Sequence, residues 1–327
     1  MSDVLTKILF LIVGLFVLFF AISKVDLEEV YGQFSYVGWY GLVLVLIIYF
    51  FAFSADSMTW NLTIVSLPFN FQWIARSFAI RLIGEALNNT IPLGGVGGEP
   101  AKAVLMRTHY GVAYSEAVAS LILVKTINMV SLCIFFIIGF LLLSISQNFS
   151  VNLKQGAFLG LLSAIVLTGL LFGVQKTKFS IDFAKLLGYL IKGKYLDNFL
   201  IYFKEFNISL ANFYGQHRTR LCCGICFGLV NWLLGVIEVY VVMGLLGVPV
   251  SFSEAYIIES VAQMVRMGTF FIPMSIGAQE GALLLIVNTV TGSASAGLAL
   301  GIIRRLREFI WIAFGFLIGI KYSTTKN

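Results

Sequence analysis

The sequence is poor in charged side chains. Only 12% of its 327 residues are Asp, Glu, Lys or Arg, whereas a soluble globular domain usually carries about 25%. Hydrophobic residues make up 59% of the chain, and the mean hydropathy is +0.94. A single water-soluble core of this length cannot bury that much apolar surface. The composition therefore excludes an ordinary soluble domain.

Histidine and cysteine are also scarce, with two and four residues. Cys223 and Cys226 have redox or zinc spacing, but they form one isolated pair at the start of an apolar run, so we interpret them as buried small hydrophobes. No H-E-x-x-H, Walker loop or paired-aspartate nucleotide motif is present in the sequence. We therefore expect no metal, no cofactor and no direct use of ATP. The net charge of +6 is explained by Lys and Arg in cytoplasmic loops, without nucleic acid as a partner.

Long apolar runs point to a membrane protein. Each is close to the ~20 residues that span hydrocarbon, or extends to that length. The first lacks a small-x-small cleavage site and is read as a retained helix and not as a signal peptide. We predict an all-α polytopic membrane protein whose single transmembrane domain covers residues 1–327. The predicted spanning runs are residues 8–22, 37–53, 121–143, 156–174, 221–246 and 298–320.

The distribution of Lys and Arg predicts the topology. Residues 175–220 hold eight basic residues against three acidic ones, which indicates a cytoplasmic, amphipathic linker. The loops that follow the outward-going runs are acidic or nearly uncharged, and both termini are expected in the cytoplasm. This assignment holds only if residues 71–108 and 254–290 each return to the side from which they entered. We therefore predict about six spanning helices plus two re-entrant helix pairs.

The two re-entrant segments resemble each other. Residues 91–101 can be laid on 272–282 so that Ile-Pro, Glu and Ala coincide without a gap. Because one segment enters from inside and the other from outside, the pattern predicts an inverted repeat, which is typical of transporters. The first repeat covers about 37–145 and the second about 221–320. A plain helix-break-helix loop would explain the prolines and glycines, but not the acids.

Charged residues within these apolar segments are candidates for function. A charge facing lipid costs ~2.5–3.5 kcal/mol, so these residues either pair structurally or line a polar path; we favour the path. Arg81 and Glu85 are four residues apart and can pair locally. A helix beginning near Pro100 behind glycines is typical of an anion site, which suits a lipid phosphate. The candidate substrate-binding residues are Arg81, Glu85, Gly94, Gly97, Gly98, Glu99, Lys102, Arg107, Lys125, Arg266, Glu280 and Arg304.

The two acids Glu99 and Glu280 leave three roles open. They would suit a cationic headgroup, a coupling proton, or a salt bridge to Arg266 or Arg304. The glycine backbone with Lys102 and Arg107 is expected to hold phosphate from the cytoplasmic side.

Several motifs resemble one known family. GEALN at 84–88 leading to Ile-Pro, GGEPAKA at 97–103, YSEAVAS at 114–120 and the second Ile-Pro to QEGA at 279–282 are similar to the transmembrane (flippase) region of lysylphosphatidylglycerol synthases. The resemblance spans about residues 37–320. It implies a bundle with two inverted re-entrant elements that moves aminoacylated phospholipid across the bacterial cytoplasmic membrane. The chain ends without the soluble synthase domain, so we expect a stand-alone member.

One motif departs from the family. Where the family tends to read E-R-x-x-D, residues 124–128 read V-K-T-I-N, so the cation is kept at Lys125 and both acids are lost. This favours a neutral or anionic lipid over a cationic lysyl headgroup.

The sequence thus favours a lipid flippase or scramblase that is not an enzyme. Its expected partner is a membrane phospholipid or related lipid, with a homodimer as a further possibility. An intramembrane lipid-modifying enzyme and a secondary transporter of a small polar solute remain the alternatives. Lipid conversion by purified protein would favour the enzyme, and solute uptake without lipid movement would favour the transporter.

Overall fold

The protein is an all-helical bundle. The computed structural model describes residues 27–90, 97–146, 149–176, 206–270 and 272–324, and within these ranges it contains helices and no strand. The elements are α2 (Leu27–Thr63), α3 (Phe71–Thr90), α4 (Glu99–Tyr110), α5 (Tyr114–Ile145), α6 (Val151–Lys176), α9 (Arg218–Leu245), α10 (Phe252–Gly268), the short 3-10 helix η1 (Pro273–Ser275), α11 (Ala278–Thr291) and α12 (Ala294–Thr324).

Four helices in the described residues are long and apolar enough to cross a membrane. They are Tyr36–Thr63, Tyr114–Ile145, Val151–Gly173 and Arg218–Leu245, and they cover four of the six predicted runs to within one residue. The run at 8–22 lies outside the described residues. The run at 298–320 lies in α12, whose apolar sequence is interrupted by charged residues between 304 and 308. At about 1.5 Å per residue, α12 is nonetheless longer than the ~30 Å hydrocarbon core. The polytopic membrane protein predicted from the sequence is confirmed.

The outer surface of the bundle is apolar. On α6, large side chains such as Leu159 and Val166 are 65% and 58% exposed, which suits contact with lipid tails. At the kinked start of α2, where Gly38 has φ 54°, Tyr36 and Tyr40 are 77% and 89% exposed; exposed aromatics are typical of a membrane interface. The interpretation of the cysteine pair as buried is wrong, because Cys223 and Cys226 are exposed on α9.

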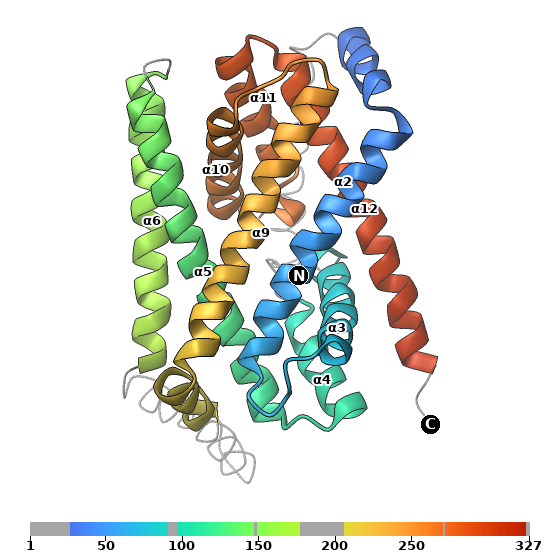
Figure 1. The fold of residues 1–327 in the computed structure, drawn as a ribbon, viewed down its shortest axis with the longest axis vertical. Coiled ribbons are helices and arrows are strands. Elements are labelled where there is room, and N and C mark those ends of the chain that lie inside the picture. The colour runs from blue at the N-terminus through green and yellow to red at the C-terminus, as the bar shows by residue number, and fades with distance from the viewer. Residues whose placement is uncertain (1–26, 91–96, 147–148, 177–205, 271, 325–327) are drawn as a thin grey trace, which may run out of the picture.

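Two helix pairs occupy opposite halves of the bundle. In Figure 1, α3 and α4 lie in the lower half and α10 and α11 in the upper half. Helices α4 and α11 have 12 and 14 residues, which is too short to cross the hydrocarbon core, and α10 with 17 residues is at the lower limit of a spanning helix. The second break contains Met274 and Ser275 with φ of 53° and 51°, a backbone region that costs side-chain-bearing residues energy.

Helix boundaries recur along the chain. The offset of 181 residues that places Ile91 on Ile272 also places the first residue of α3 on the first residue of α10. The same offset brings α4 within two residues of α11 at its start, and α5 within one residue of α12 at its start. The helices on the two sides of the linker therefore follow one another in the same order.

The two sets of helices are packed across each other. The most extensive contact joins α2 and α9, the central pair in Figure 1. Helix α12 packs on α3, where Gly315 lies against the main chain of Leu82, and α5 packs on α10, where Gly139 lies against Ser260. Small residues at these crossings allow the close approach that membrane helices use for packing.

Candidate functional site

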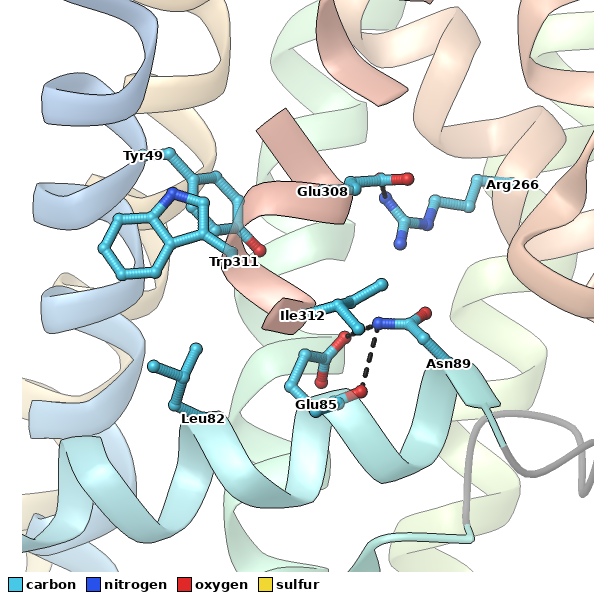
Figure 2. A pocket seen from close by; sticks show the side chains of 9 residues that line it. Tyr49, Leu82, Glu85, Asn89, Arg266, Glu308, Trp311 and Ile312 are labelled. Carbon is cyan, nitrogen blue, oxygen red and sulfur yellow. Dashed lines mark hydrogen bonds and ion pairs between the residues drawn. The ribbon is translucent and has the colours of Figure 1, made fainter. Parts of the chain in front are cut away.

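A polar cavity lies where these helices meet. Its volume is about 280 Å³, room for several water molecules, and side chains from six helices, α2, α3 and α9 to α12, line it. Its walls are Tyr49, Ala52, Phe53, Asp56, Arg81, Glu85, Asn231, Trp232, Gly235, Glu238, Glu259, Gln263, Arg266, Gln279, Arg304 and Arg307. A smaller cavity of about 20 Å³ shares Tyr49, Glu85 and Arg266 with it (Figure 2).

The charged residues in and beside this cavity form two groups. The N-terminal charge group, on α2 to α5, consists of Asp56, Arg81, Glu85, Glu99, Lys102 and Lys125. The C-terminal charge group, on α9 to α12, consists of Glu238, Glu259, Arg266, Glu280, Arg304, Arg305, Arg307 and Glu308. Each group has as many acidic as basic members, and among the described residues no ion pair joins one group to the other.

In the N-terminal charge group, Arg81 is held from α2. Its guanidinium pairs with Asp56, and Asn128 Nδ2 donates to Asp56 Oδ1 at 2.8 Å. The local pair between Arg81 and Glu85 that their spacing allowed is not formed. The carboxylate of Asp56 replaces it because α2 packs on α3 and brings an acid to the same depth.

The rest of this group surrounds Glu99, the first residue of α4. Lys102 Nζ lies 2.9 Å and Lys125 Nζ 3.3 Å from Glu99 Oε1, and Asn88 Nδ2 donates to the same oxygen at 3.4 Å. The Lys102 side chain is 2% exposed, whereas that of Lys125 is 52% exposed. Glu99 thus joins one buried cation and one accessible cation.

Two glycines bring α3 and α4 together at this point. A Cβ on Gly98 would collide with the main-chain carbonyl of Gly84, and a Cβ on Gly84 would collide with the Lys102 side chain. Gly98 N also donates to Asn88 Oδ1 at 2.7 Å, so this amide at the start of α4 is already satisfied. The close approach buries Lys102 between the two helices.

In the C-terminal charge group, α12 supplies the cations in one run. Arg304 pairs with Glu259 of α10 and lies 3.5 Å from Glu238 of α9, and Arg307 pairs with Glu238. The four side chains are at most 7% exposed. A guanidinium shared between carboxylates is the arrangement that compensates buried charge best, because its donors are fixed in a planar fork.

The next arginine along α12 connects to α11. Arg305 pairs with Glu280, and its Nη1 lies 2.8 Å from Glu308 Oε2. The other carboxylate oxygen of Glu280 accepts from Gly277 N at 2.8 Å, which caps the start of α11. Glu280 therefore corresponds in place to Glu99: each stands at the beginning of the second helix of its pair and meets a cation of the following long helix.

Two members of the charge groups, Glu85 and Arg266, can accept further ion-pair or hydrogen-bond partners. Among the described residues, no cation lies within ion-pair distance of Glu85, and its carboxylate accepts one long hydrogen bond, from Asn89 Nδ2 at 3.4 Å. Arg266 makes one long ion pair, 3.4 Å to Glu308, and its side chain is 37% exposed. Figure 2 shows Arg266 entering from α10 on one side of the cavity and Glu85 from α3 on the other.

Unsatisfied donors also border the cavities. Trp232 Nε1 and Arg307 Nε, in the wall of the larger cavity, are buried and find no hydrogen-bond partner in the described part of the chain, and the same holds for Trp311 Nε1 in the wall of the smaller one. Such groups cost free energy unless water or a ligand satisfies them. The cavity therefore favours an occupant with acceptor oxygens.

The structure brings most of the sequence-predicted residues together. Arg81, Glu85, Arg266 and Arg304 line the larger cavity. Glu99, Lys102, Lys125 and Glu280 belong to the charge groups beside it. Gly97 and Gly98 lie at the start of α4, Arg107 is exposed in its last turn away from both cavities, and Gly94 lies outside the described residues.

Sequence reasoning missed several members of the site. Asp56 and Glu238 are single acids inside long apolar helices, and that isolation was the signal available for them. Arg307 and Glu308 lie inside the predicted spanning run 298–320, where the same signal was available. Tyr49 and Trp232 gave no signal, because aromatic residues are common throughout the chain.

Comparisons with known proteins agree with this architecture. The family model of the lysylphosphatidylglycerol synthase transmembrane region matches residues 5–315. A UPF0104 membrane protein from Methanothermobacter thermautotrophicus is 23% identical over 263 residues, which are 75% of this chain and 74% of the relative. No solved structure matches the chain. Among the described residues, no group of three or more His, Cys, Asp or Glu side chains is placed to hold a metal ion.

Proposed function

Because the chain belongs to the lysylphosphatidylglycerol synthase transmembrane region family, we propose that it moves the polar headgroup of a phospholipid across the membrane, as a flippase or scramblase. The observation that carries the proposal is the polar cavity between two helix pairs from opposite halves of the bundle. A polar headgroup needs such a path because its charges are costly in hydrocarbon. The acyl chains stay in lipid beside the bundle.

The proposal includes the arrangement in the membrane. We take α3–α4 and α10–α11 as re-entrant pairs of an inverted repeat, entering from opposite leaflets. The short helices α4 and α11, the position of the two pairs in opposite halves and the recurrence at an offset of 181 residues support this. At the second break, Ile272 and Ser275 are buried in protein, the surroundings that such backbone requires. We place the protein in the cytoplasmic membrane with both termini inside, as the basic linker indicates.

Leaflet exchange in proteoliposomes tests the proposal. Lipids labelled on an acyl chain keep their natural headgroups, and a quencher added outside measures how much label crosses. We expect the protein to accelerate exchange, and Ala52→Phe to slow it at least about tenfold by filling the cavity without changing its charge, a loss of ~1.4 kcal/mol of transition-state stabilisation. Ala52 is buried in the cavity wall.

Controls keep the test decisive. Leu159→Phe, which places the same aromatic ring on the exposed face of α6 outside both cavities, should exchange lipid like the unchanged protein. Ala52→Val, a smaller intrusion, should give an intermediate rate and guards against misfolding of the larger substitution. If no lipid of any headgroup exchanges with folded protein, the proposed function is wrong. If folded Ala52→Phe exchanges lipid at the full rate, the cavity is not the path.

A further inference from the structure

The charge balance around the cavity restricts what it can hold. The N-terminal charge group has three carboxylates and three cations, and the C-terminal charge group has four of each. Each group is neutral when all its members are ionised. An occupant with net charge would leave one charge uncompensated in a low-dielectric interior, where the penalty is several kcal/mol per ion. A polar occupant with no net charge avoids that penalty.

Two residues of opposite charge border this cavity and can each take a further ion-pair partner. Glu85 has no ion-pair partner among the described residues, and Arg266 has one long ion pair. All other carboxylates of the two groups pair with at least one cation of their own group. An ammonium therefore finds its free carboxylate at Glu85, and an anion finds its most accessible guanidinium at Arg266.

The repeat places these two residues opposite each other. The offset of 181 residues that relates Ile91 to Ile272 and Glu99 to Glu280 also relates Glu85 to Arg266. Both project from the first helix of a pair, and both border the two cavities. Equivalent positions in the two pairs thus carry opposite charges across a shared space (Figure 2). The acceptors of Glu85 and the donors of Arg266 define one negative and one positive end.

We propose that the cavity recognises a zwitterionic headgroup, a phosphate linked to an ammonium, with the phosphate at Arg266 and the ammonium at Glu85. This inference rests on the proposed lipid movement and names its cargo class. The unsatisfied indole N–H groups of Trp232 and Trp311 add donors for phosphate oxygens. Guanidinium suits phosphate because its donors form a planar fork, and a carboxylate suits ammonium because it offers only acceptors.

Exchange of three acyl-labelled lipids tests the inference. Phosphatidylethanolamine is neutral overall, phosphatidylglycerol carries one negative charge, and lysylphosphatidylglycerol carries one positive charge. We expect the unchanged protein to move phosphatidylethanolamine about tenfold faster than either charged lipid, which corresponds to ~1.4 kcal/mol. A charged lipid moving fastest would overturn the inference while leaving the proposed function intact.

Charge variants make the test specific. Glu85→Gln leaves the site with one excess positive charge and should shift the preference to phosphatidylglycerol. Arg266→Gln leaves one excess negative charge and should shift it to lysylphosphatidylglycerol. The double variant is neutral again and should favour phosphatidylethanolamine, at a lower rate. If both single variants slow all three lipids equally, the two residues do not read headgroup charge and the inference fails.

A soluble probe separates the lipid from its headgroup alone. Radiolabelled glycerophosphoethanolamine is a phosphodiester and carries the same net-neutral zwitterion without acyl chains. No uptake, together with phosphatidylethanolamine exchange, supports both the proposed function and its cargo. Uptake that is lost in Glu85→Gln and Arg266→Gln, with no lipid exchange, would overturn lipid movement while supporting recognition of the zwitterion. Thermal unfolding of each variant in detergent verifies that it is folded.

Discussion

Both charge groups compensate charges inside the bundle, but they use different residue types to do so. The C-terminal charge group draws all its cations from arginines, and three of them stand together on α12. Its carboxylates come from three other helices and from Glu308 of α12 itself. The N-terminal charge group uses one arginine and two lysines spread over three helices. One of those lysines is half exposed, and one of the acids has no ion pair among the described residues.

This difference indicates a division of labour. In the C-terminal charge group, Arg304 and Arg307 are nearly fully buried between carboxylates, so removing any one charge leaves another stranded. That network ties α12 to α9 and α10. In the N-terminal charge group, Glu85 has no ion pair among the described residues and Lys125 is half exposed. The ion pairs of this group can therefore rearrange without leaving a buried charge uncompensated. We therefore expect substitutions of Arg304 and Arg307 to act on stability, and substitutions of Glu85 to act on transport.

The largest effect should come from Arg304→Ala. The substitution strands Glu259, which is 2% exposed, and breaking a buried pair in this way costs about 3–5 kcal/mol. Thermal unfolding in detergent should show a clearly lower midpoint temperature. Arg304→Ala with Glu259→Ala should recover part of the loss, since no charge of that pair remains. An unchanged midpoint in the single variant would show that the network is not structural.

A smaller but definite loss is expected for Asn128→Asp, which restores the acid that the family tends to carry. Asp56 Oδ1 loses a donor at 2.8 Å, which costs about 1–3 kcal/mol, and two carboxylates then share Arg81. The variant also gives the N-terminal charge group a net negative charge. Unfolding should occur at a lower temperature than for Asn128→Ala, which loses the same bond without adding charge. Equal midpoints would mean that the added charge is neutralised locally.

Gly98→Ala tests the close approach of α3 and α4. The added Cβ meets the main chain of Gly84, which cannot move aside like a flexible side chain, and overpacking of this kind costs about 1–3 kcal/mol. Gly169→Ala is the matched control, because nothing lies within 4 Å of its Cβ on α6. The control should be as stable as the unchanged protein or more so, because alanine favours helix. A stable Gly98→Ala protein would mean that the two helices can separate.

The smallest change is expected for Lys125→Ala. Its side chain is 52% exposed and Lys102 remains 2.9 Å from the shared carboxylate, so the unfolding free energy should fall by less than about 1 kcal/mol. Lys102→Ala should cost distinctly more, because Lys102 is buried against Gly84. Equal losses in the two variants would show that the buried Lys102 contributes no more to stability than the half-exposed Lys125.

The sequence predicted the membrane bundle because the mean hydropathy of a twenty-residue segment identifies a spanning helix, whichever helices pack beside it. Four of six predicted runs lie in helices that meet the length and composition of a span. The α12 run shows where that reasoning weakens. Its arginines lower the hydropathy of the sequence, yet in the fold they are compensated by acids on α9, α10 and α11.

Local sequence patterns could not predict which charged residues form ion pairs with each other. Arg81 pairs with Asp56, 25 residues earlier, and not with Glu85 one turn away. Likewise Glu280 meets Arg305, whereas the sequence suggested Arg266 or Arg304. Such choices depend on which helices pack together and on their depth, and spacing along one helix carries no information about either. The inverted repeat inferred from a few shared letters stays a prediction, although the helix boundaries recur at the same offset of 181 residues.

The packing of the long helices across the two halves of the chain has a mechanical consequence. Helix α12 packs on α3 as well as on α11, and α5 packs on α10 as well as on α4. Moving one half past the other as a rigid body would therefore separate α12 from α3, α5 from α10 and α2 from α9 together. The bundle is interlocked in this way, and it is not built as two hinged blocks.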